Sequence, residues 1–141
     1  MAKPKRHNDW VYRSGLEEKI DEQLRAAHAT FTYETDKIKY TIPESVHVYT
    51  PDFTITTESG KIIYVETKGI WDSQDRYKHL LIKQQHPELD IRFVFQNSKA
   101  KIRKGSKTTY ADICNGLGRA PFKAVVWKYT DKHIPLQWLR E

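Results

Sequence analysis

Two apolar segments joined by a helical one constrain the fold of this chain more than any other feature. Residues 61–68 (KIIYVETK) and 91–95 (IRFVF) have the β-branched and aromatic content typical of buried strands. Residues 73–85 between them have helical spacing, follow a cluster of N-capping side chains and end before Pro87. A crossover of about 20 residues joins strands that run parallel, almost always with a right-handed connection. The sequence therefore predicts a β-α-β unit.

The elements expected around this unit give an α/β class with a small mixed central sheet flanked by helices. A helix is expected to begin at Ser14, which suits the N-cap, with Glu17 at the third helical position as in a capping box. The turn at 58–60 pairs the strand before it with residues 61–68. The remaining predicted elements are strands over 31–34, 38–42 and 46–56, a short helix over 108–117 and apolar segments at 125–127 and 134–138 that pack on the core.

Length and composition exclude several classes of protein. A chain of 141 residues fits one domain that buries roughly 68% of its extended-chain surface. The aromatic content of 12% argues against disorder, and no apolar run approaches the ~18 residues of a membrane span. The basic N-terminal residues are not followed by the apolar stretch of a secretory signal. The single cysteine, Cys114, cannot form an intrachain disulfide, which suits a reducing cytoplasm.

The net charge of +6 is unevenly distributed along the chain. Residues 1–13 form a basic arm of net charge +3 and residues 97–128 a segment of +7, whereas residues 14–96 carry −4. Basic runs with Gly, Ser and Thr suit phosphate contacts, although they also occur as solvated loops that maintain solubility. We therefore expect an arm over 1–13 and a single domain over 14–141. The candidate DNA contacts are Lys3, Lys5, Arg6, Arg13, Lys99, Lys101, Arg103, Lys104 and Lys107.

Two carboxylates and one lysine form the candidate catalytic group. Glu66 and Lys68 are two residues apart on a predicted strand, so their side chains share one face. The predicted hairpin brings Asp52 beside them. A Glu-x-Lys pair on a strand is most often an exposed ion pair, but Asp52 and Glu66 lie among apolar strand residues, where an unneutralised carboxylate is costly. This placement favours a functional site.

Neighbouring carboxylates repel each other unless one binds a proton or both hold a cation. Hard oxygen ligands that leave room for water and phosphate suit Mg²⁺ or Mn²⁺. Such an ion polarises a scissile phosphate and lowers the pKa of an attacking water. Lys68 would orient that water, help deprotonate it or screen the charge of the phosphorane. The residues therefore predict metal-dependent hydrolysis of a phosphodiester.

Several short motifs extend this pattern to a known family. Pro51-Asp52 followed by Glu66-Thr67-Lys68 resembles the motif of the PD-(D/E)xK nuclease superfamily. Four motifs in chain order are similar to the phage endonuclease I family of junction-resolving enzymes: RSGLE at 13–17, YTPDF at 49–53, VETKG at 65–69 and HPELDIR at 86–92. The resemblance runs from Arg13 to Thr109 and resumes weakly at 134–138, whereas residues 118–129 match nothing in that family.

The resemblance implies a PD-(D/E)xK nuclease-like fold and a catalytic site formed by Glu17, Asp52, Glu66 and Lys68. It implies Mg²⁺ as the cofactor, with Mn²⁺ as a substitute. The expected metal ligands are Glu17, Asp52, Glu66 and the backbone carbonyl of Thr67.

The same resemblance implies an intertwined homodimer that binds branched double-stranded DNA and resolves four-way (Holliday) junctions. Residues 14–42 would be exchanged between the chains and residues 43–51 would bridge them, so that Glu17 of one protomer completes the site of its partner. Such an enzyme acts in the cytoplasm, that of a bacterial host if it is phage-encoded, and not in a membrane. Two alternatives are another PD-(D/E)xK nuclease, of restriction or transposon-end type, and a non-catalytic nucleic-acid-binding module.

Overall fold

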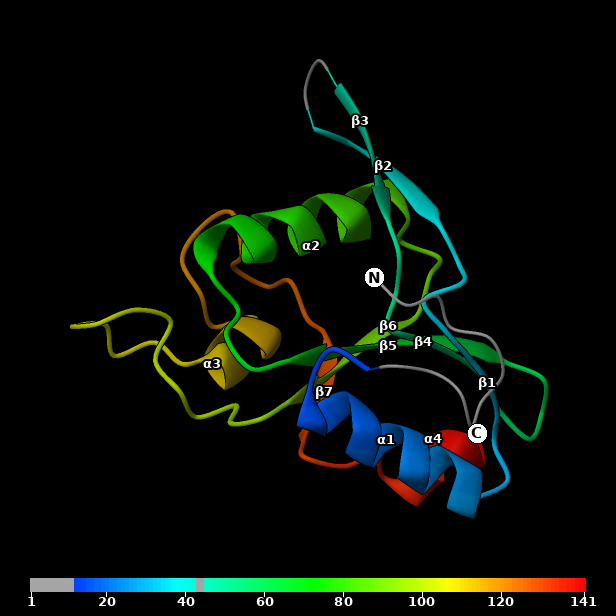
Figure 1. Cartoon of the computed structure of the whole chain (residues 1–141). Coiled ribbons are helices and arrows are strands. Elements are labelled where there is room, and N and C mark those ends of the chain that lie inside the picture. The colour runs from blue at the N-terminus through cyan, green and yellow to red at the C-terminus, as the bar shows by residue number, and fades with distance from the viewer. Residues whose placement is uncertain (1–11, 43–44) are drawn as a thin grey trace.

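A computed structural model describes residues 12–42 and 45–141 of the chain (Figure 1). The predicted contacts at Lys3, Lys5 and Arg6 lie outside these ranges. None of the helices in the two ranges is long and apolar enough to cross a membrane. In chain order the elements are α1 (Gly15–Ala26), β1 (Thr30–Tyr33), β2 (Ile38–Ile42), β3 (Ser45–Tyr49), β4 (Phe53–Thr56), β5 (Ile62–Lys68), α2 (Ser73–Gln85), β6 (Ile91–Phe95), α3 (Tyr110–Cys114), β7 (Lys128–Asp131) and α4 (Leu136–Leu139).

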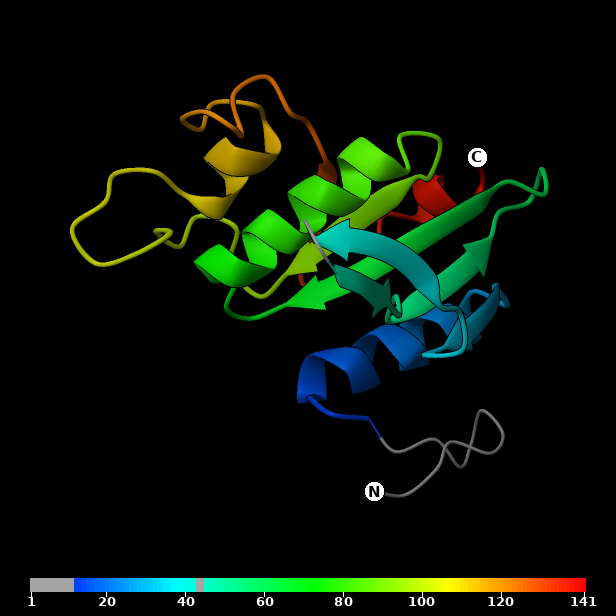
Figure 2. The same cartoon turned by 90° about the horizontal axis from the view of Figure 1, so that it is seen from above.

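The main sheet contains five strands in the order β1-β4-β5-β6-β7. Strands β1, β4 and β5 pair antiparallel, whereas β5, β6 and β7 pair parallel, which confirms the predicted α/β class with a mixed sheet. The register Tyr64↔Ile91 to Lys68↔Phe95 confirms the β-α-β unit in which α2 connects β5 to β6. Figures 1 and 2 show α2 on one face of the sheet and α1 with α4 on the other.

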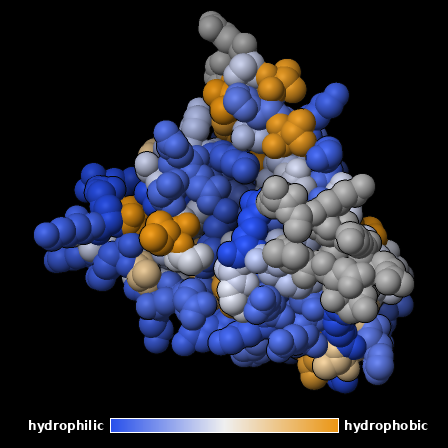
Figure 3. Space-filling model, viewed as in Figure 1, coloured by the Kyte–Doolittle hydropathy of each residue, from blue (hydrophilic) through white to orange (hydrophobic). Residues whose placement is uncertain are grey.

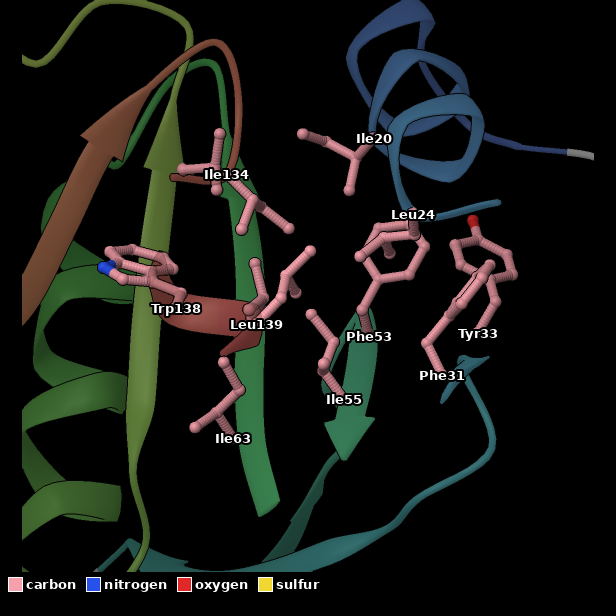
Figure 4. Close-up of a cluster of buried hydrophobic side chains, with 12 residues drawn as sticks. Ile20, Leu24, Phe31, Tyr33, Phe53, Ile55, Ile63, Ile134, Trp138 and Leu139 are labelled. Atoms are coloured by element: carbon pink, nitrogen blue, oxygen red, sulfur yellow. The ribbon is translucent and has the colours of Figure 1, made fainter. Parts of the chain in front are cut away.

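The face of the sheet toward α1 carries the largest apolar cluster. Ile20 and Leu24 of α1 are fully buried against side chains that alternate along β4 and β5. Figure 4 shows these side chains converging from α1, β1, β4, β5 and the C-terminal segment. Burial of one Leu or Ile contributes about 2 kcal/mol, so this cluster fixes α1 and β1 on the sheet. Its members are Ile20, Leu24, Phe31, Tyr33, Phe53, Ile55, Ile63, Val65, Val94, Ile134, Trp138 and Leu139.

Helix α2 covers the opposite face. Its Leu81 and Ile82 pack with Ile91 of β6 and Tyr49 of β3. Trp71, which is fully buried, belongs to a neighbouring cluster that includes α3. Strand β5 is thus covered on both faces, and consecutive residues of this strand point alternately toward α1 and toward α2. This alternation determines where the candidate catalytic side chains lie.

The strand predicted over 46–56 is two strands in different sheets. Strand β3 pairs with β2 in a two-stranded hairpin that projects from the body in Figure 1, and β4 belongs to the main sheet. The break falls at Pro51, which has no backbone N–H to donate to a ladder. Asp52 then donates its backbone N–H to the side chain of Glu66. The prediction of one continuous strand was therefore wrong.

The predicted helix over 108–117 is shorter than expected. Helix α3 begins after Thr109, which forms a capping box with Asp112. It ends before Gly116, whose φ of +77° lies in the left-handed region that terminates helices. The sequence pattern located this helix but overestimated its length.

The C-terminal segment packs on the core only in part. Trp127, Ile134 and Trp138 are buried as predicted, but Val126 and Leu136 are each 52% exposed. Strand β7 was missed because its four residues, KYTD, lack the apolar pattern of a central strand. As an edge strand next to β6, it can expose polar side chains to solvent.

Candidate active site

Asp52 and Glu66 meet where the β4–β5 hairpin ends. The register Phe53↔Val65 places Asp52, the residue before β4, beside Glu66 near the C-terminal end of β5. One oxygen of the Asp52 carboxylate accepts hydrogen bonds from the backbone N–H and the hydroxyl of Thr67, at 2.9 and 2.8 Å. The backbone N–H of Asp52 lies 3.4 Å from Oε1 of Glu66. Both carboxylates are buried, and the predicted juxtaposition is observed.

Glu17 reaches Asp52 from α1. The hydroxyl of Ser14 accepts from the backbone N–H of Glu17 at 3.1 Å, which confirms the predicted N-cap. The Glu17 carboxylate accepts from the backbone N–H of Arg13 and from the hydroxyl of Tyr33, at 2.8 and 2.9 Å. The Glu17 side chain therefore belongs to the acidic cluster. It does not accept from the backbone N–H of Ser14, as the predicted capping box would require.

Glu34, which was not among the predicted site residues, also joins this cluster. One carboxylate oxygen from each of Glu17, Glu34 and Asp52 lies within 4.8 Å of the others. Glu34 follows β1 with a φ of +52°, unusual for a glutamate, and its backbone N–H donates to the carbonyl of Asp52. Arg13, a predicted DNA contact, pairs with Glu34 at 3.0 Å. No motif marked Glu34, because its place depends on the pairing of β1 with β4.

Glu66 and Lys68 face α2, on the other side of β5 from the acidic cluster. The hydroxyl of Tyr49 donates to Glu66 at 2.7 Å, and the ammonium of Lys68 lies 3.2 Å from the same carboxylate. The ammonium also lies 2.5 Å from Asp75 in the first turn of α2. Among the described residues, the group of three carboxylates does not include Glu66. The candidate site therefore has two parts on opposite sides of β5, the acidic cluster and the Glu66–Lys68 pair. Asp52 contacts both parts.

Burial keeps these carboxyls protonated to unusually high pH. Desolvation, opposed by the Thr67 hydrogen bonds, raises the pKa of Asp52 to about 6. Desolvation and the neighbouring charge of Asp52 raise the pKa of Glu66 to about 7, despite Lys68. Burial also disfavours the charge on Lys68, but Glu66 and Asp75 outweigh it and raise the pKa of the ammonium. Lys68 thus remains a cation at neutral pH, and the carboxylates attract a further positive charge.

The ligand chemistry of the cluster suits a hard divalent cation. Its donors are carboxylate oxygens from α1, from the residue after β1 and from the residue before β4, and two of the three residues are buried. Mg²⁺ and Mn²⁺ prefer such donors, and the positive charge of a bound cation would offset the desolvation and the repulsion that raise the pKa of Asp52. Neither a thiol nor an imidazole belongs to the cluster. The residues present therefore fit the ion expected from the sequence.

Comparison with known proteins identifies the family. The family described as Phage endonuclease I matches residues 1–141. The chain belongs to the phage endonuclease I family. It is 48% identical over 131 residues to "Endonuclease I" of Escherichia phage T7, covering 93% of this chain and 80% of that protein. It is equally similar, over 93% of its length and 78% of the relative's, to "Endodeoxyribonuclease 1" of Enterobacteria phage T3.

This phage endonuclease I chain carries the first part of its second basic segment, residues 99–107, on a projecting loop. The loop lies at the left of Figure 1, in yellow, and its surface is hydrophilic in Figure 3. An isolated bridge between Lys101 and Thr109 closes its base, and the backbone N–H of Ile102 donates to the carbonyl of Thr108. Five predicted DNA contacts are exposed here: Lys99, Lys101, Arg103, Lys104 and Lys107.

Proposed function

We propose that this protein is a divalent-metal-dependent DNA endonuclease that resolves four-way junctions by paired phosphodiester hydrolysis. The observation that carries the proposal is the position of Asp52, which links the Glu17–Glu34 cluster to Glu66 and Lys68 at one strand end. Two relatives named as an endonuclease and an endodeoxyribonuclease support hydrolysis of DNA. The exposed basic loop supports contact with a polyanion.

The expected metal ligands are Glu17, Asp52, Glu66 and the Thr67 carbonyl, and the geometry adds Glu34. When bound, Mg²⁺ or Mn²⁺ supplies charge that polarises the scissile phosphate and lowers the pKa of water. Lys68 bears a positive charge held between two carboxylates, which suits it to orient the attacking water and to screen charge on the phosphorane. A general-base role would require loss of the proton that Glu66 and Asp75 retain on Lys68.

We further propose a homodimer in which residues 14–42 are exchanged and residues 43–51 bridge the chains. The β2–β3 hairpin supports an exchange, because opening it would convert its two strands into one extended connection. Residues 43 and 44 lie outside the described ranges. Val46 and Val48 of this hairpin are 68% and 49% exposed, which leaves apolar surface for a second copy. An exchange preserves the contacts of Glu17 and Glu34 with Asp52, now between chains.

The deciding experiment compares cleavage of a synthetic four-way junction with that of a linear duplex of the same sequence, in Mg²⁺ and in EDTA. We expect metal-dependent cleavage of the junction and little of the duplex. Equal cleavage of both would leave a nuclease without junction selectivity, and a requirement for one short sequence would indicate a restriction or transposon-end type. Binding without cleavage would indicate a non-catalytic module.

Two variants connect that activity to the site. Lys68→Ala should abolish cleavage and leave junction binding intact, and Glu17→Gln should do the same. Glu22→Gln, on the exposed face of the same helix, is the matched control for Glu17. Full activity of Lys68→Ala would disprove the role assigned to this residue.

The buried, free thiol of Cys114 fits the proposed location in a reducing cytoplasm.

A further inference from the structure

A second pocket, distinct from the carboxylate site, is lined by basic side chains. It has a volume of about 480 Å³ and lies between the first turn of α2, the basic loop and the segment after α3. Four cationic side chains line it, from Arg76, Arg103, Lys107 and Arg119. Among the described residues that line the pocket, none is acidic. Such a charge distribution favours an anion.

Arg76 shows that the pocket is built into the fold. The residue is only 6% exposed, and one guanidinium nitrogen donates to the backbone carbonyl of Trp71. The residue before it, Asp75, is paired with Lys68, and among the described residues no carboxylate forms an ion pair with Arg76. Desolvation lowers the pKa of Arg76, opposed by the charges of Asp72 and Asp75 and reinforced by that of Arg103. Because Arg76 has no carboxylate partner in the described part of the chain, its positive charge is available to an anion that accepts from the guanidinium in the pocket.

The loop that supplies Arg103 and Lys107 is held in a defined shape. The backbone N–H of Ser106 donates to the carbonyl of Arg103 at 3.1 Å, and Gly105 between them has a φ of +83°. The backbone N–H of Thr108 donates to the hydroxyl of Ser106 at 3.1 Å. These bonds hold the two cationic residues at the rim of the pocket and do not neutralise their charge.

The other wall is apolar and closely packed. Gly118 lies so near α3 that an added Cβ would be 2.7 Å from Cδ1 of Ile113 and 3.2 Å from Cβ of Phe122. Ile113 and Phe122 line the pocket, and Arg119 follows directly after Gly118. An apolar wall beside converging cations lowers the local dielectric constant and strengthens their attraction for an anion.

We propose that this pocket is a phosphate-binding subsite that holds a backbone phosphate of the DNA substrate. The proposal rests on the proposed nuclease function. Planar guanidinium groups bind phosphate oxygens in a bidentate manner, and the pocket offers three of them. Arg76 and Asp75 are consecutive residues of α2, one facing the pocket and the other Lys68. A phosphate held there fixes the DNA strand relative to the carboxylates.

The experiment measures junction binding in EDTA, so that no cleavage occurs, at near-physiological ionic strength. Arg103→Gln and Arg119→Gln each remove an exposed pocket cation. Lys123→Gln is the matched control, exposed on the same segment as Arg119 but absent from the pocket lining and from the predicted DNA contacts. We expect about a tenfold loss of affinity for each pocket variant and less than about threefold for the control. Equal losses in pocket and control variants would show an effect of overall charge and overturn the proposal.

A second experiment distinguishes a site for DNA phosphates from a site for free inorganic phosphate. Arginine side-chain Nε–Hε signals are followed by NMR during titration of wild-type protein with inorganic phosphate and with junction DNA. We expect both ligands to shift the signals of Arg76 and Arg119, and Arg76→Lys to weaken both responses if its melting temperature shows that it folds. Shifts with inorganic phosphate alone would show a free-phosphate site and overturn a role in DNA binding.

The two hypotheses fail in different ways. If wild-type protein binds and cleaves the junction while the pocket variants match the control, only the subsite is overturned. If wild-type protein binds no DNA, the nuclease function and the DNA subsite both fail.

Discussion

Lys68 and Asp75 form an ion pair with 2.5 Å between Nζ and Oδ2, and their side chains are 12% and 22% exposed. The pair connects the end of β5 to the first turn of α2. Asp75 is itself held there, because its backbone N–H donates to the side chain of Asp72, the N-cap of the helix. The helix therefore sets where the ammonium of Lys68 lies relative to Glu66, and we propose that Asp75 positions Lys68.

If Lys68 has the proposed catalytic role, Asp75→Asn should lower kcat by about 10- to 100-fold with a smaller effect on KM, because displacement of a catalytic group costs rate more than binding. Loss of one of the two carboxylates that retain the proton of Lys68 also lowers the pKa of the ammonium. The alkaline limb of the pH–rate profile should therefore move to lower pH. Asp72→Asn is the control, since it removes a cap from the same helix turn. An unchanged profile would mean that Asp75 does not act through Lys68.

The metal-free protein should lose stability as the pH rises from about 5 to 8. The pKa values of Asp52 and Glu66 are raised to about 6 and about 7 in the folded state. The folded state therefore binds more protons than the unfolded state, so stability falls as these carboxyls ionise. At about 1.4 kcal/mol per pKa unit, the loss is of the order of 2–4 kcal/mol. Urea unfolding in EDTA measures it.

Asp52→Asn combined with Glu66→Gln provides the control for this pH dependence. The amides cannot ionise, so the free energy of unfolding of the variant should vary less with pH across the same range. The variant should also be more stable than wild type at the upper end of that range. Mg²⁺ should stabilise wild type more at high pH than at low pH, because it competes with protons for the carboxylates. If the free energy of unfolding changed equally with pH in wild type and in the double variant, the pH dependence would arise from other groups.

Local patterns were sufficient to predict the parts of the site that lie on one strand or one hairpin. The period of a strand puts Glu66 and Lys68 on one face, and the turn at 58–60 brings Asp52 to them. Asp75 belongs to none of the motifs. An acidic residue in the first turn of a helix is common because it complements the helix dipole, so nothing in the sequence distinguishes Asp75. Only the packing of α2 on β5 shows that it contacts Lys68.

The features that the sequence did not predict depend on contacts between distant segments. Glu34 enters the acidic cluster because β1 pairs with β4, a pairing that no local pattern specifies. Strand β7 is stabilised by its neighbour β6 more than by its own composition. Arg92, in the middle of an apolar strand, is fully buried and bound by Asp90 and Glu141, and the latter lies 49 residues away.

The Arg92 cluster should contribute strongly to stability. The guanidinium is fully buried, donates to Asp90 and Glu141 at 2.7–2.8 Å, and lies 5.0 Å from the ring centroid of Trp138. Removing both acids leaves an uncompensated buried charge, so Asp90→Asn with Glu141→Gln should cost about 3–5 kcal/mol. Arg92→Met, which replaces the charge by an apolar chain, should cost less. Urea denaturation at neutral pH gives both values, and the opposite order would contradict the assignment.

Mixing experiments with inactive variants distinguish an exchanged dimer from sites formed within one chain. In the exchanged dimer, Glu17 and Glu34 of one protomer would face Asp52 of its partner. Glu17→Gln chains refolded with Asp52→Asn chains would then yield heterodimers with one intact site. Half of the dimers would be mixed, and each mixed dimer would have one intact site of two. Nicking should therefore recover to roughly a quarter of the wild-type rate. Sites formed within one chain would each keep a lesion and show no recovery.

The position of Glu34 directly after β1, within the segment proposed to be exchanged, makes this test more specific. Glu34→Gln should complement Asp52→Asn, because the two lesions would fall in the same site of a mixed dimer and leave the other site intact. It should not complement Glu17→Gln, since every site would then carry one lesion from the exchanged segment. Refolding each variant alone controls for residual activity. Recovery in the Glu17→Gln and Glu34→Gln mixture would show that α1 and β1 do not move together between protomers.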